Sequence, residues 1–556
     1  MLRRHLASAA LLSALMTADA PAAEPFDVTM TVDAAKKIGP MKPIYRFFGA
    51  DEPNYAYMKD GRRLLGEIGK LGTPPTYFRA HNILSSGDGT PSLKWGSTNV
   101  YTEDANGNPV YDFTVVDRIF DAYLSNGVRP YVQLGFVPEA MSTHPQPYRH
   151  EWRPGLPYKM IMTGWSYPPK DYEKWRELCR KLTEHCVQKW GREEVEKWYF
   201  ECWNEPNGDY WHGSAEEWYK LHDYAMDGVR RALPTARVGG PHTAGAGGKF
   251  AQGFYEHCLR GTNYATGQKG TPLDFLSFHA KGSPTFVDGH VRMGVAAQLK
   301  EIDKGFAMIA EFPELKNRPI VIGESDPDGC AACQGPQLAY RSGTMYSSYT
   351  AASFARKYDL ADKHGVNLEG AVTWAFEFED QPYFAGQRTL ATNGIPLPVF
   401  NVFRLLATMK GDRVAADSTN AMRLDAMTQS GVRGEADVGC LAAADANTLY
   451  VLTWHYHDDD LPGPDAKVTI NLSGLKAGAY TVTESRVDAA RGNALTVWKN
   501  AGSPVGPDAK LYQAMQDASA NLSTGPASSI DVMAESAKLP VSLPRQAVSL
   551  LVITQK

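Results

Sequence analysis

The amino-acid sequence predicts a parallel (β/α)8 barrel followed by a smaller antiparallel β-sandwich domain. Residues 44–410 repeat one unit eight times: a short apolar run, a polar or glycine-containing turn, and a helical stretch. Alternation at this spacing is typical of parallel strands joined by right-handed helical crossovers. No glycine-rich dinucleotide fingerprint follows the first run, which disfavours an open Rossmann-type sheet. After residue 410, short β-like runs separated by turn residues indicate the sandwich.

The eight barrel units can be placed along the chain one by one. The predicted strands are Ile44–Gly49, Thr76–His81, Arg129–Phe136, Lys197–Trp203, Arg237–His242, Phe275–His279, Ile320–Gly323 and Ala371–Phe376. The predicted helices are Asp60–Lys70, Val115–Asn126, Asp171–Trp190, Ala215–Arg231, Phe250–Arg260, Val291–Phe312, Leu338–His364 and Pro398–Met409. In such a barrel the chemistry takes place at the C-terminal ends of the strands.

The regions outside the barrel have other expected roles. Residues 1–23 combine a basic start, a short apolar core and small residues, which predicts a signal peptide and a secreted or periplasmic protein.

Residues 24–40 contain an alternating run that could add a strand to the sandwich. We assign 41–410 to the catalytic barrel and 411–556 to the accessory sandwich, with a long loop over Asn500–Ser536. A carbohydrate-binding module is the alternative to a structural role for the sandwich. The predicted strands of the sandwich are Leu449–Trp454, Lys467–Leu472, Tyr480–Ser485 and Ala547–Thr554.

The composition excludes some classes of partner. The formal charge of −5 at pH 7 and the lack of a basic patch argue against nucleic acid and fit neutral or weakly polar substrates. No stretch after the signal is long and apolar enough to span a bilayer. Cys330 and Cys333 form a CxxC pair that export could oxidise to a disulfide, and nothing around them favours a redox motif or a zinc site. The other five cysteines fit small core positions.

The stretch Trp198–Asn207, WYFECWNEPN, places a carboxylate at the end of a buried strand. Trp198–Trp203 is aromatic and apolar, and Pro206 forbids further ladder pairing just after Glu205. An isolated glutamate there could cap the next helix or pair with a surface cation. The Asn-Glu-Pro context at a barrel strand end favours a catalytic role instead.

A second carboxylate, Glu324, ends the apolar run in PIVIGES, Pro319–Ser325. By strand count, Glu205 and Glu324 end strands four and seven, which lie across the barrel mouth from each other. Two such carboxylates can cleave a glycosidic bond if one is protonated and the other ionised. A gap of about 5–5.5 Å between them would mean a covalent glycosyl-enzyme and retention of configuration, and a larger gap would mean inversion.

The motifs around these residues resemble those of glycoside hydrolase family 39. WYFECWNEPN is similar to that family's acid/base signature, and similar segments run in the same order through nearly the whole barrel. They are NGVRPYVQLGFVPEAMS (Asn126–Ser142), YPPKDYEKW (Tyr167–Trp175), VGGPHTAG (Val238–Gly245), LDFLSFHAKG (Leu273–Gly282) and NGIPLPVFNVFRLL (Asn393–Leu406). The barrel-plus-sandwich layout is similar to that of the family's β-xylosidases. The run of Asp326, Pro327 and Asp328 after the strand-seven motif departs from the simpler polar turn that we expect.

The resemblance implies a role for each motif residue. Glu205 would be the general acid/base and Glu324 the nucleophile. Asn204, just before the acid/base, would hydrogen-bond the 2-hydroxyl of the sugar. His279 ends strand six beside the expected position of Glu324, and a hydrogen bond from it would hold the nucleophile ionised.

Other strand ends supply candidate substrate-binding residues. Arg79 and His81 end strand two: Arg79 would orient carboxylates or form a structural ion pair, and His81 would bind a sugar hydroxyl. His242 on strand five could bind substrate or be a core histidine. Trp374 on strand eight would form an apolar floor under the sugar, although a lone tryptophan is often core. The remaining candidates are Phe136 at the end of strand three and Glu377, Glu379 and Phe384 after strand eight.

The residues and the resemblance together predict a retaining exo-glycosidase, a β-xylosidase that acts on xylo-oligosaccharides by double displacement. The alternative is the same mechanism on an α-L-iduronide or L-arabinoside. Arg149 or Arg153, in the long loop 138–170, could supply the cation that a uronic acid needs. A carbohydrate-binding protein that has lost catalysis is a third possibility, and the presence of both carboxylates argues against it. The mechanism calls for no metal or organic cofactor, and the sequence leaves the oligomeric state open.

Overall fold

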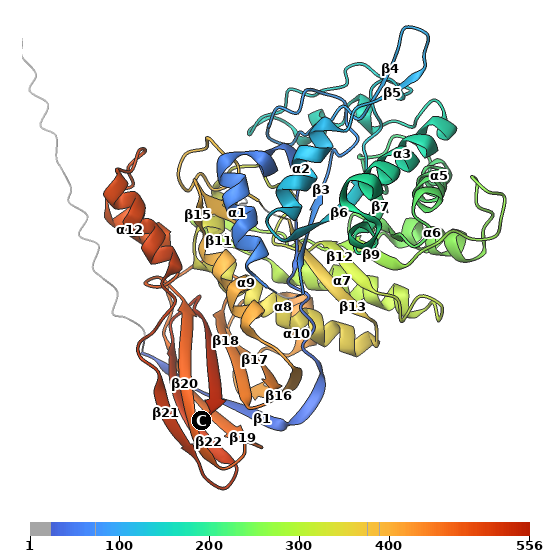
Figure 1. Cartoon of the computed structure of the whole chain (residues 1–556). Coiled ribbons are helices and arrows are strands. Elements are labelled where there is room, and N and C mark those ends of the chain that lie inside the picture. The colour runs from blue at the N-terminus through green and yellow to red at the C-terminus, as the bar shows by residue number, and fades with distance from the viewer. Residues whose placement is uncertain (1–23, 73, 375, 388–389) are drawn as a thin grey trace, which may run out of the picture.

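The computed structural model describes residues 24–72, 74–374, 376–387 and 390–556, and the expected signal peptide lies outside them. Figure 1 shows two parts, a barrel wrapped by helices and a sheet that carries the C-terminus. Within the described residues, no helix is both long enough and apolar enough to cross a membrane.

Eight parallel strands close the barrel, which confirms the predicted fold class. In the order in which they pair they are β2 (Phe47–Ala50), β3 (Thr76–Ala80), β6 (Val128–Leu134), β7 (Tyr199–Cys202), β8 (Arg237–Thr243), β9 (Phe275–His279), β12 (Ile320–Glu324) and β13 (Leu368–Trp374). Every predicted run overlaps its strand. Strands buried on both faces read as short apolar runs between turn residues, so their positions are visible in the sequence.

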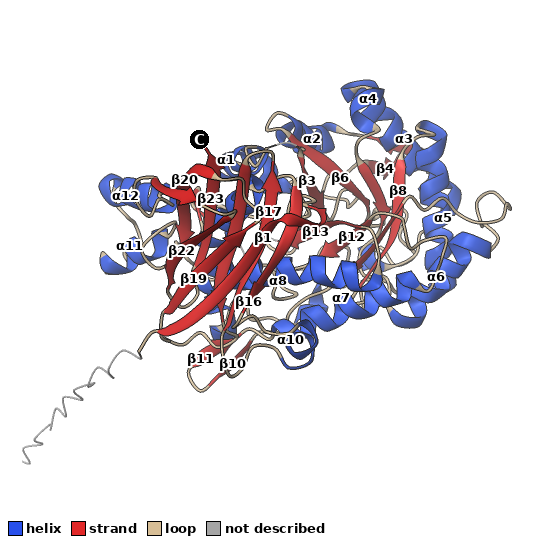
Figure 2. Cartoon of the chain, turned by 90° about the horizontal axis from the view of Figure 1, so that it is seen from below, coloured by secondary structure: helices blue, strands red, loops and turns tan. Residues whose placement is uncertain are grey.

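Helices cover the outside of the barrel (Figure 2). They are α1 (Lys59–Gly69), α2 (Thr114–Leu124), α3 (Tyr172–Trp190), α5 (Ala215–Ala232), α6 (Gly248–Arg260), α7 (Val295–Ala310), α8 (Thr344–His364) and α9 (Pro398–Thr408). The helix predicted from Val291 begins later, because the hairpin β10 (Thr285–Val287) and β11 (His290–Arg292) takes up its first residues. Shorter helices are α4 (Arg192–Val195), α10 (Leu424–Ser430) and α11 (Ala494–Asn500).

The second part is a mostly antiparallel sheet of nine strands. In spatial order they are β21 (Ser528–Val532), β20 (Gly478–Val487), β23 (Val548–Gln555), β18 (Thr448–Tyr456), β17 (Asp437–Asp445), β16 (Asp412–Ser418), β1 (Phe26–Pro40), β19 (Ala466–Ser473) and β22 (Ser536–Leu543). β1 pairs antiparallel with β16 and parallel with β19, so the N-terminal strand runs inside the C-terminal sheet (Figure 1). Side chains from strands across the sheet meet in one apolar cluster, as in a sandwich.

The central strands of this sheet are buried on both faces. In β18, Leu449 and Val451 enter the sheet's own core, whereas Tyr450 and Leu452 join the core of the barrel. Neighbouring residues of a strand point to opposite faces, so one strand can serve both cores. The sheet therefore packs directly against the barrel.

The prediction of a long loop over residues 500–536 is wrong. α12 (Ala509–Ala520) and β21 lie within this stretch. The side chain of Asp508 caps the first turn of α12, and the Tyr512 hydroxyl donates a hydrogen bond to Asn393 O at 2.9 Å. The small polar residues concealed a helix that docking against the loop after β13 stabilises.

Candidate active site

Side chains inside the barrel lie in layers, because alternate residues of a strand point into it. Tyr77, Arg79 and His81 follow one another toward the C-terminal end of β3. Tyr77 belongs to an aromatic floor, with its ring centroid 5.2 Å from that of Phe47 and 4.9 Å from that of Tyr199. Arg79 belongs to a charged layer above this floor, and His81 reaches the layer of the two candidate catalytic carboxylates.

Arg79 is the centre of the charged layer. Its fully buried guanidinium donates hydrogen bonds to Glu201 Oε1 at 2.6 Å, Asn204 Oδ1 at 2.9 Å and Glu324 Oε1 at 3.2 Å. The planar fork of arginine suits several fixed acceptors at once. Arg79 therefore orients both the candidate nucleophile and the asparagine that precedes Glu205.

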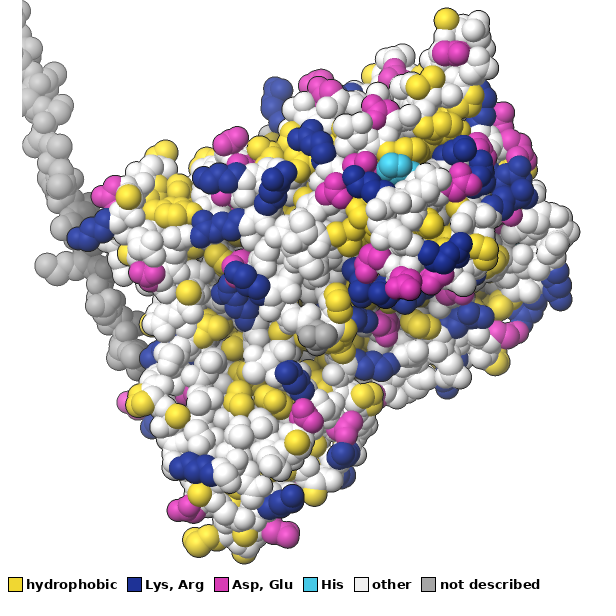
Figure 3. Space-filling view, in the orientation of Figure 1, with side chains coloured by type: hydrophobic (Ala, Val, Ile, Leu, Met, Phe, Trp, Pro, Cys, Tyr) yellow, Lys and Arg dark blue, Asp and Glu magenta, His cyan; other side chains and the backbone are white. Residues whose placement is uncertain are grey.

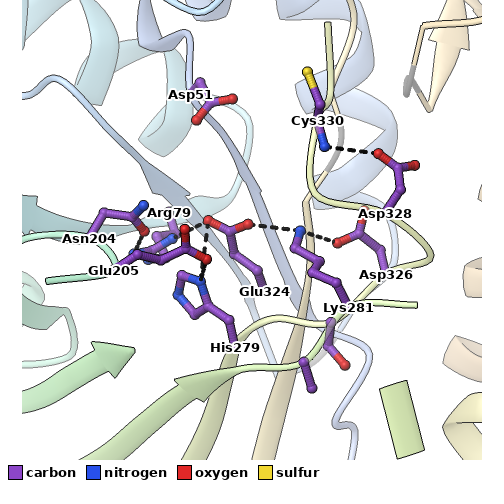
Figure 4. Close-up of polar contacts among 12 residues, drawn as sticks. Asp51, Arg79, Asn204, Glu205, His279, Lys281, Glu324, Asp326, Asp328 and Cys330 are labelled. Atoms are coloured by element: carbon purple, nitrogen blue, oxygen red, sulfur yellow. Dashed lines mark hydrogen bonds and ion pairs between the residues drawn. The ribbon is translucent and has the colours of Figure 1, made fainter. Parts of the chain in front are cut away.

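Glu205 and Glu324 meet across the barrel mouth (Figure 4), where a carboxylate oxygen of one lies within 4.8 Å of a carboxylate oxygen of the other. The Glu205 side chain is 24% exposed and that of Glu324 is 5% exposed. Trp203 and Glu205 have φ angles of +74° and +44°, in the left-handed region that turns the chain sharply out of β7. Non-glycine residues seldom adopt this conformation, and it is concentrated at functional sites.

Two cations, Lys281 and Arg79, and the imidazole of His81 lie against Glu324. Lys281 Nζ lies 2.7 Å from Glu324 Oε2 and 2.5 Å from Asp326 Oδ1, and His81 Nε2 lies 3.5 Å from Glu324 Oε1. Burial alone would raise the pKa of Glu324, but the charge of Lys281, followed by that of His279, brings the pKa well below its usual range. Glu324 is therefore ionised at neutral pH, as a nucleophile has to be.

His279 lies between the two carboxylates. We expected its hydrogen bond to go to Glu324, but its Nδ1 is 2.9 Å from Glu205 Oε1 and 3.7 Å from Glu324 Oε1. The reason is the turn after β7, where the Glu205 N–H donates to His242 O at 2.9 Å and thereby fixes Glu205 beside β8 and β9.

Glu205, His279 and Glu324 are also close enough to hold a metal ion. However, the ammonium of Lys281 already lies against Glu324, and the Arg79 guanidinium donates to the same carboxylate. A further cation beside them would meet strong repulsion in this buried site. The arrangement fits acid/base and nucleophilic chemistry better than metal binding.

A cavity of about 570 Å³ opens above the carboxylates. This volume is in the range of small-ligand sites, which is about 300–1,000 Å³. Cys330 and Cys333 are joined in a disulfide, and their loop forms one wall. The lining includes Asp51, Lys94, Tyr158, Asn204, Glu205, Tyr210, Glu324, Cys330, Cys333 and Trp374.

The predicted site residues divide into two groups. Asn204, Glu205, Glu324 and Trp374 line the cavity. Arg79, His81 and His279 contact its carboxylates from below or from the side. These seven side chains come from five different strand ends, which the barrel brings together.

Three other predicted substrate-binding residues neither line the cavity nor contact its two carboxylates with their side chains. Phe136 is buried among other aromatic rings. His242 pairs with Glu201 in the charged layer, and burial lowers the pKa of His242 to about 4. Glu377 accepts a hydrogen bond from the Gly394 N–H at 2.6 Å, and burial raises its pKa to about 8. Each of these positions is a core environment next to the site.

Sequence reasoning missed three charged residues of the site, Asp51, Lys94 and Lys281. Asp51 directly follows the apolar run of β2, and Lys281 comes two residues after the end of β9. Applying the strand-end rule to every strand would have found both. Lys94 lies in a loop, where no local pattern marks it.

Comparisons with known proteins place the chain in a family. The sequence model of Glycosyl hydrolases family 39 matches residues 28–531. The chain is 26% identical over 464 residues to a β-xylosidase of Geobacillus stearothermophilus, with 81% of each chain covered. It is 26% identical over 566 residues to the α-L-iduronidase of Homo sapiens, which covers 94% of this chain and 78% of the human one. The fold matches the crystal structure of a monomeric β-xylosidase from Caulobacter crescentus CB15 with a TM-score of 0.73 at 22% identity, over 95% and 99% of the two chains. The chain is a glycoside hydrolase that belongs to family 39.

Proposed function

We propose that the protein is a retaining exo-glycosidase that hydrolyses β-xylosidic bonds of xylo-oligosaccharides. The observation that carries the mechanism is the separation of at most 4.8 Å between carboxylate oxygens of Glu205 and Glu324. Retaining glycosidases hold their carboxyl groups about 5–5.5 Å apart, whereas inverting enzymes leave about 6.5–9.5 Å for a water molecule. The spacing supports attack by a carboxylate on the sugar itself.

In the first step an oxygen of Glu324 attacks the anomeric carbon while the bond from that carbon to the leaving oxygen breaks. Glu205 gives its proton to the leaving oxygen, and a covalent glycosyl-enzyme forms. Lys281 and Arg79 keep Glu324 ionised before the attack. Glu205 is the more exposed carboxyl, which suits the group that has to meet the leaving sugar and then water.

In the second step Glu205 takes a proton from a water molecule, whose oxygen attacks the anomeric carbon and releases Glu324. The product keeps the configuration of the substrate. Asn204 assists in both steps. Arg79 occupies its Oδ1, so the amide N–H groups are left to bind the 2-hydroxyl of the sugar.

The choice of a xyloside rests on the relatives, since β-xylosidases match over most of this chain. The interspersed acidic and basic side chains on the face shown in Figure 3 are consistent with a neutral substrate. Trp374 supports the sugar site from below, with the Arg79 guanidinium 4.9 Å from its ring centroid.

An α-L-iduronide is the second candidate, and the presence of Lys281 beside Glu324 favours it. An ammonium there could meet a uronic acid carboxylate, and the human α-L-iduronidase matches nearly the whole chain. Lys281 is already paired with Glu324 and Asp326, however, and Arg149 and Arg153 do not line the cavity.

The test is hydrolysis of a panel of aryl glycosides by the mature protein, with NMR detection of the first anomer released. We expect the β-xyloside to be cleaved fastest and β-xylose to appear before mutarotation. If the α-L-iduronide is cleaved fastest, the proposed substrate is wrong and the proposed mechanism stands. Release of the inverted anomer first would overturn the mechanism.

A further inference from the structure

An ion pair between Asp51 and Lys94 lies in the cavity, away from the reacting carboxylates. Lys94 Nζ pairs with Asp51 Oδ2, and His81 Nδ1 lies 2.8 Å from Asp51 Oδ1. Both side chains are almost fully buried, at 4% and 2% exposed. Burial alone would raise the pKa of Asp51 and lower that of Lys94, but their mutual attraction reverses both shifts, so both groups are charged.

The backbone around Lys94 is built to hold this charge in place. Lys94 has a φ of +57°, and its N–H donates to Glu52 Oε1 at 2.6 Å. Its carbonyl accepts a hydrogen bond from His150 Nε2 at 3.0 Å, while His150 Nδ1 accepts from the Trp152 N–H at 3.2 Å. Burial lowers the pKa of His150 to about 4, which fits this neutral tautomer. Two loops, one after β3 and one after β6, therefore cooperate to place a single ammonium group.

A buried ion pair does little for stability, because desolvation of the two charges offsets their attraction. An ammonium has three N–H donors. Among the described residues Asp51 takes one, and the ammonium lies over the Tyr158 ring, 5.1 Å from its centroid, so a donor remains for a ligand. Two charges that are costly to bury, that are held in a fixed position and that line a cavity indicate a role in binding a ligand.

The cavity has a closed end and an open end. Asp51, Lys94 and Tyr210 are buried, whereas Ser283 and Gly329 on the other side are exposed. Figure 4 shows Asp51 and Cys330 on opposite sides of the space next to Glu324. An exo-acting glycosidase needs a closed end for the terminal sugar and an open end for the leaving chain.

We propose that Asp51 and Lys94 bind the 3- and 4-hydroxyl groups of the terminal sugar and so make the enzyme select a neutral, unsubstituted glycone. This inference rests on the proposed function and deepens it. One imidazole ring, that of His81, separates Asp51 from Glu324, which matches the span of a pyranose ring. A carboxylate next to an ammonium offers an acceptor and a donor to two neighbouring hydroxyls. The pair carries no net charge, which suits a neutral sugar at this end of the cavity.

The experiment combines protein variants with deoxy substrates. We would measure kcat/KM of wild type, Asp51→Asn, Lys94→Met and the double variant on an aryl β-xyloside and on its 3-deoxy and 4-deoxy forms. With the parent substrate we expect kcat/KM of each variant to fall about 10- to 100-fold, which corresponds to the loss of one charge-assisted hydrogen bond. With the deoxy substrate that lacks the contacted hydroxyl, the loss should shrink to less than about threefold.

Equal losses on all three substrates would overturn the proposal, because they would mark a purely structural pair. Arg46→Met with Glu369→Gln is the matched control. This ion pair (2.5 Å) joins the residue before β2 to the start of β13, at the other end of the barrel, and its loss should leave the substrate pattern unchanged. If Lys94→Met does not fold, Lys94→Arg and Asp51→Asn give the same comparison. If wild type cleaves a different glycoside, the proposed function is wrong, but the deoxy forms of that glycoside still decide the role of the pair.

Discussion

Lys281 Nζ lies 2.7 Å from Glu324 Oε2. Of the neighbouring groups that lower the pKa of the candidate nucleophile, this ammonium, just after β9, has the largest effect. Lys281→Met removes this charge and leaves the carboxylate buried, which raises the pKa of Glu324. Since Glu324 has to be ionised in the free enzyme, the acidic limb of the pH profile of kcat/KM should move to higher pH. Lys304→Met, which removes an exposed lysine, is the control. An acidic limb that stays in place would contradict this role.

His279 should matter most when the leaving group needs a proton. Its hydrogen bond to Glu205 holds the candidate acid in place, at 2.9 Å. We expect His279→Ala to slow cleavage of an aryl glycoside with a poor leaving group about 100-fold, and one with a dinitrophenyl group less than about tenfold. Steady-state kinetics across a leaving-group series measures the difference. An equal loss along the series would mean that His279 does not act through Glu205.

Arg79 should stabilise the folded protein as well as support activity. Arg79→Met leaves Glu201 buried without its cation, and breaking such a buried pair costs about 3–5 kcal/mol of the free energy of unfolding. Urea unfolding of the inactive Glu205→Gln protein, with and without Arg79→Met, measures this loss. A change below about 1 kcal/mol would show that the charged layer is not structural.

The disulfide loop should affect substrate affinity more than chemistry. Arg341 donates to the carbonyls of Cys330 and Cys333, both at 2.7 Å, so part of the loop is held without the disulfide. Replacing both cysteines by serine should raise KM about 2- to 10-fold and leave kcat on an activated aryl glycoside nearly unchanged. Cys440→Ser, at a half-buried free cysteine, is the control. A large fall in kcat would tie the loop to the carboxylates themselves.

The barrel can be predicted well because each of its strands is marked by a pattern of neighbouring residues. Each buried strand is an apolar run, and the polar residue that ends it, as at Glu205 and Glu324, marks the active edge. Pairings are harder to predict, because they depend on how strand ends and loops meet in space. Neither the hydrogen bond from His279 to Glu205 nor the pair formed by Asp51 and Lys94 follows from any spacing along the chain.

The differences between the sequence analysis and the structure have a common physical cause. Phe136, His242 and Glu377 all lie close to strand ends, but side chains next to a site can point into the core beneath it. The helix at 509–520 has few apolar residues, and its contacts with the barrel were invisible to periodicity. In each case tertiary packing decided what the local pattern left open.

The most direct test of the central claim is the behaviour of Glu324→Ala in azide. We expect the variant to lose activity on an aryl β-xyloside by about 10⁴-fold or more, and azide to restore turnover as a glycosyl azide of inverted configuration. Glu205→Ala should instead give a glycosyl azide of retained configuration, because Glu324 still forms the intermediate. Full activity in Glu324→Ala, or an azide product of retained configuration from it, would show that Glu324 is not the nucleophile.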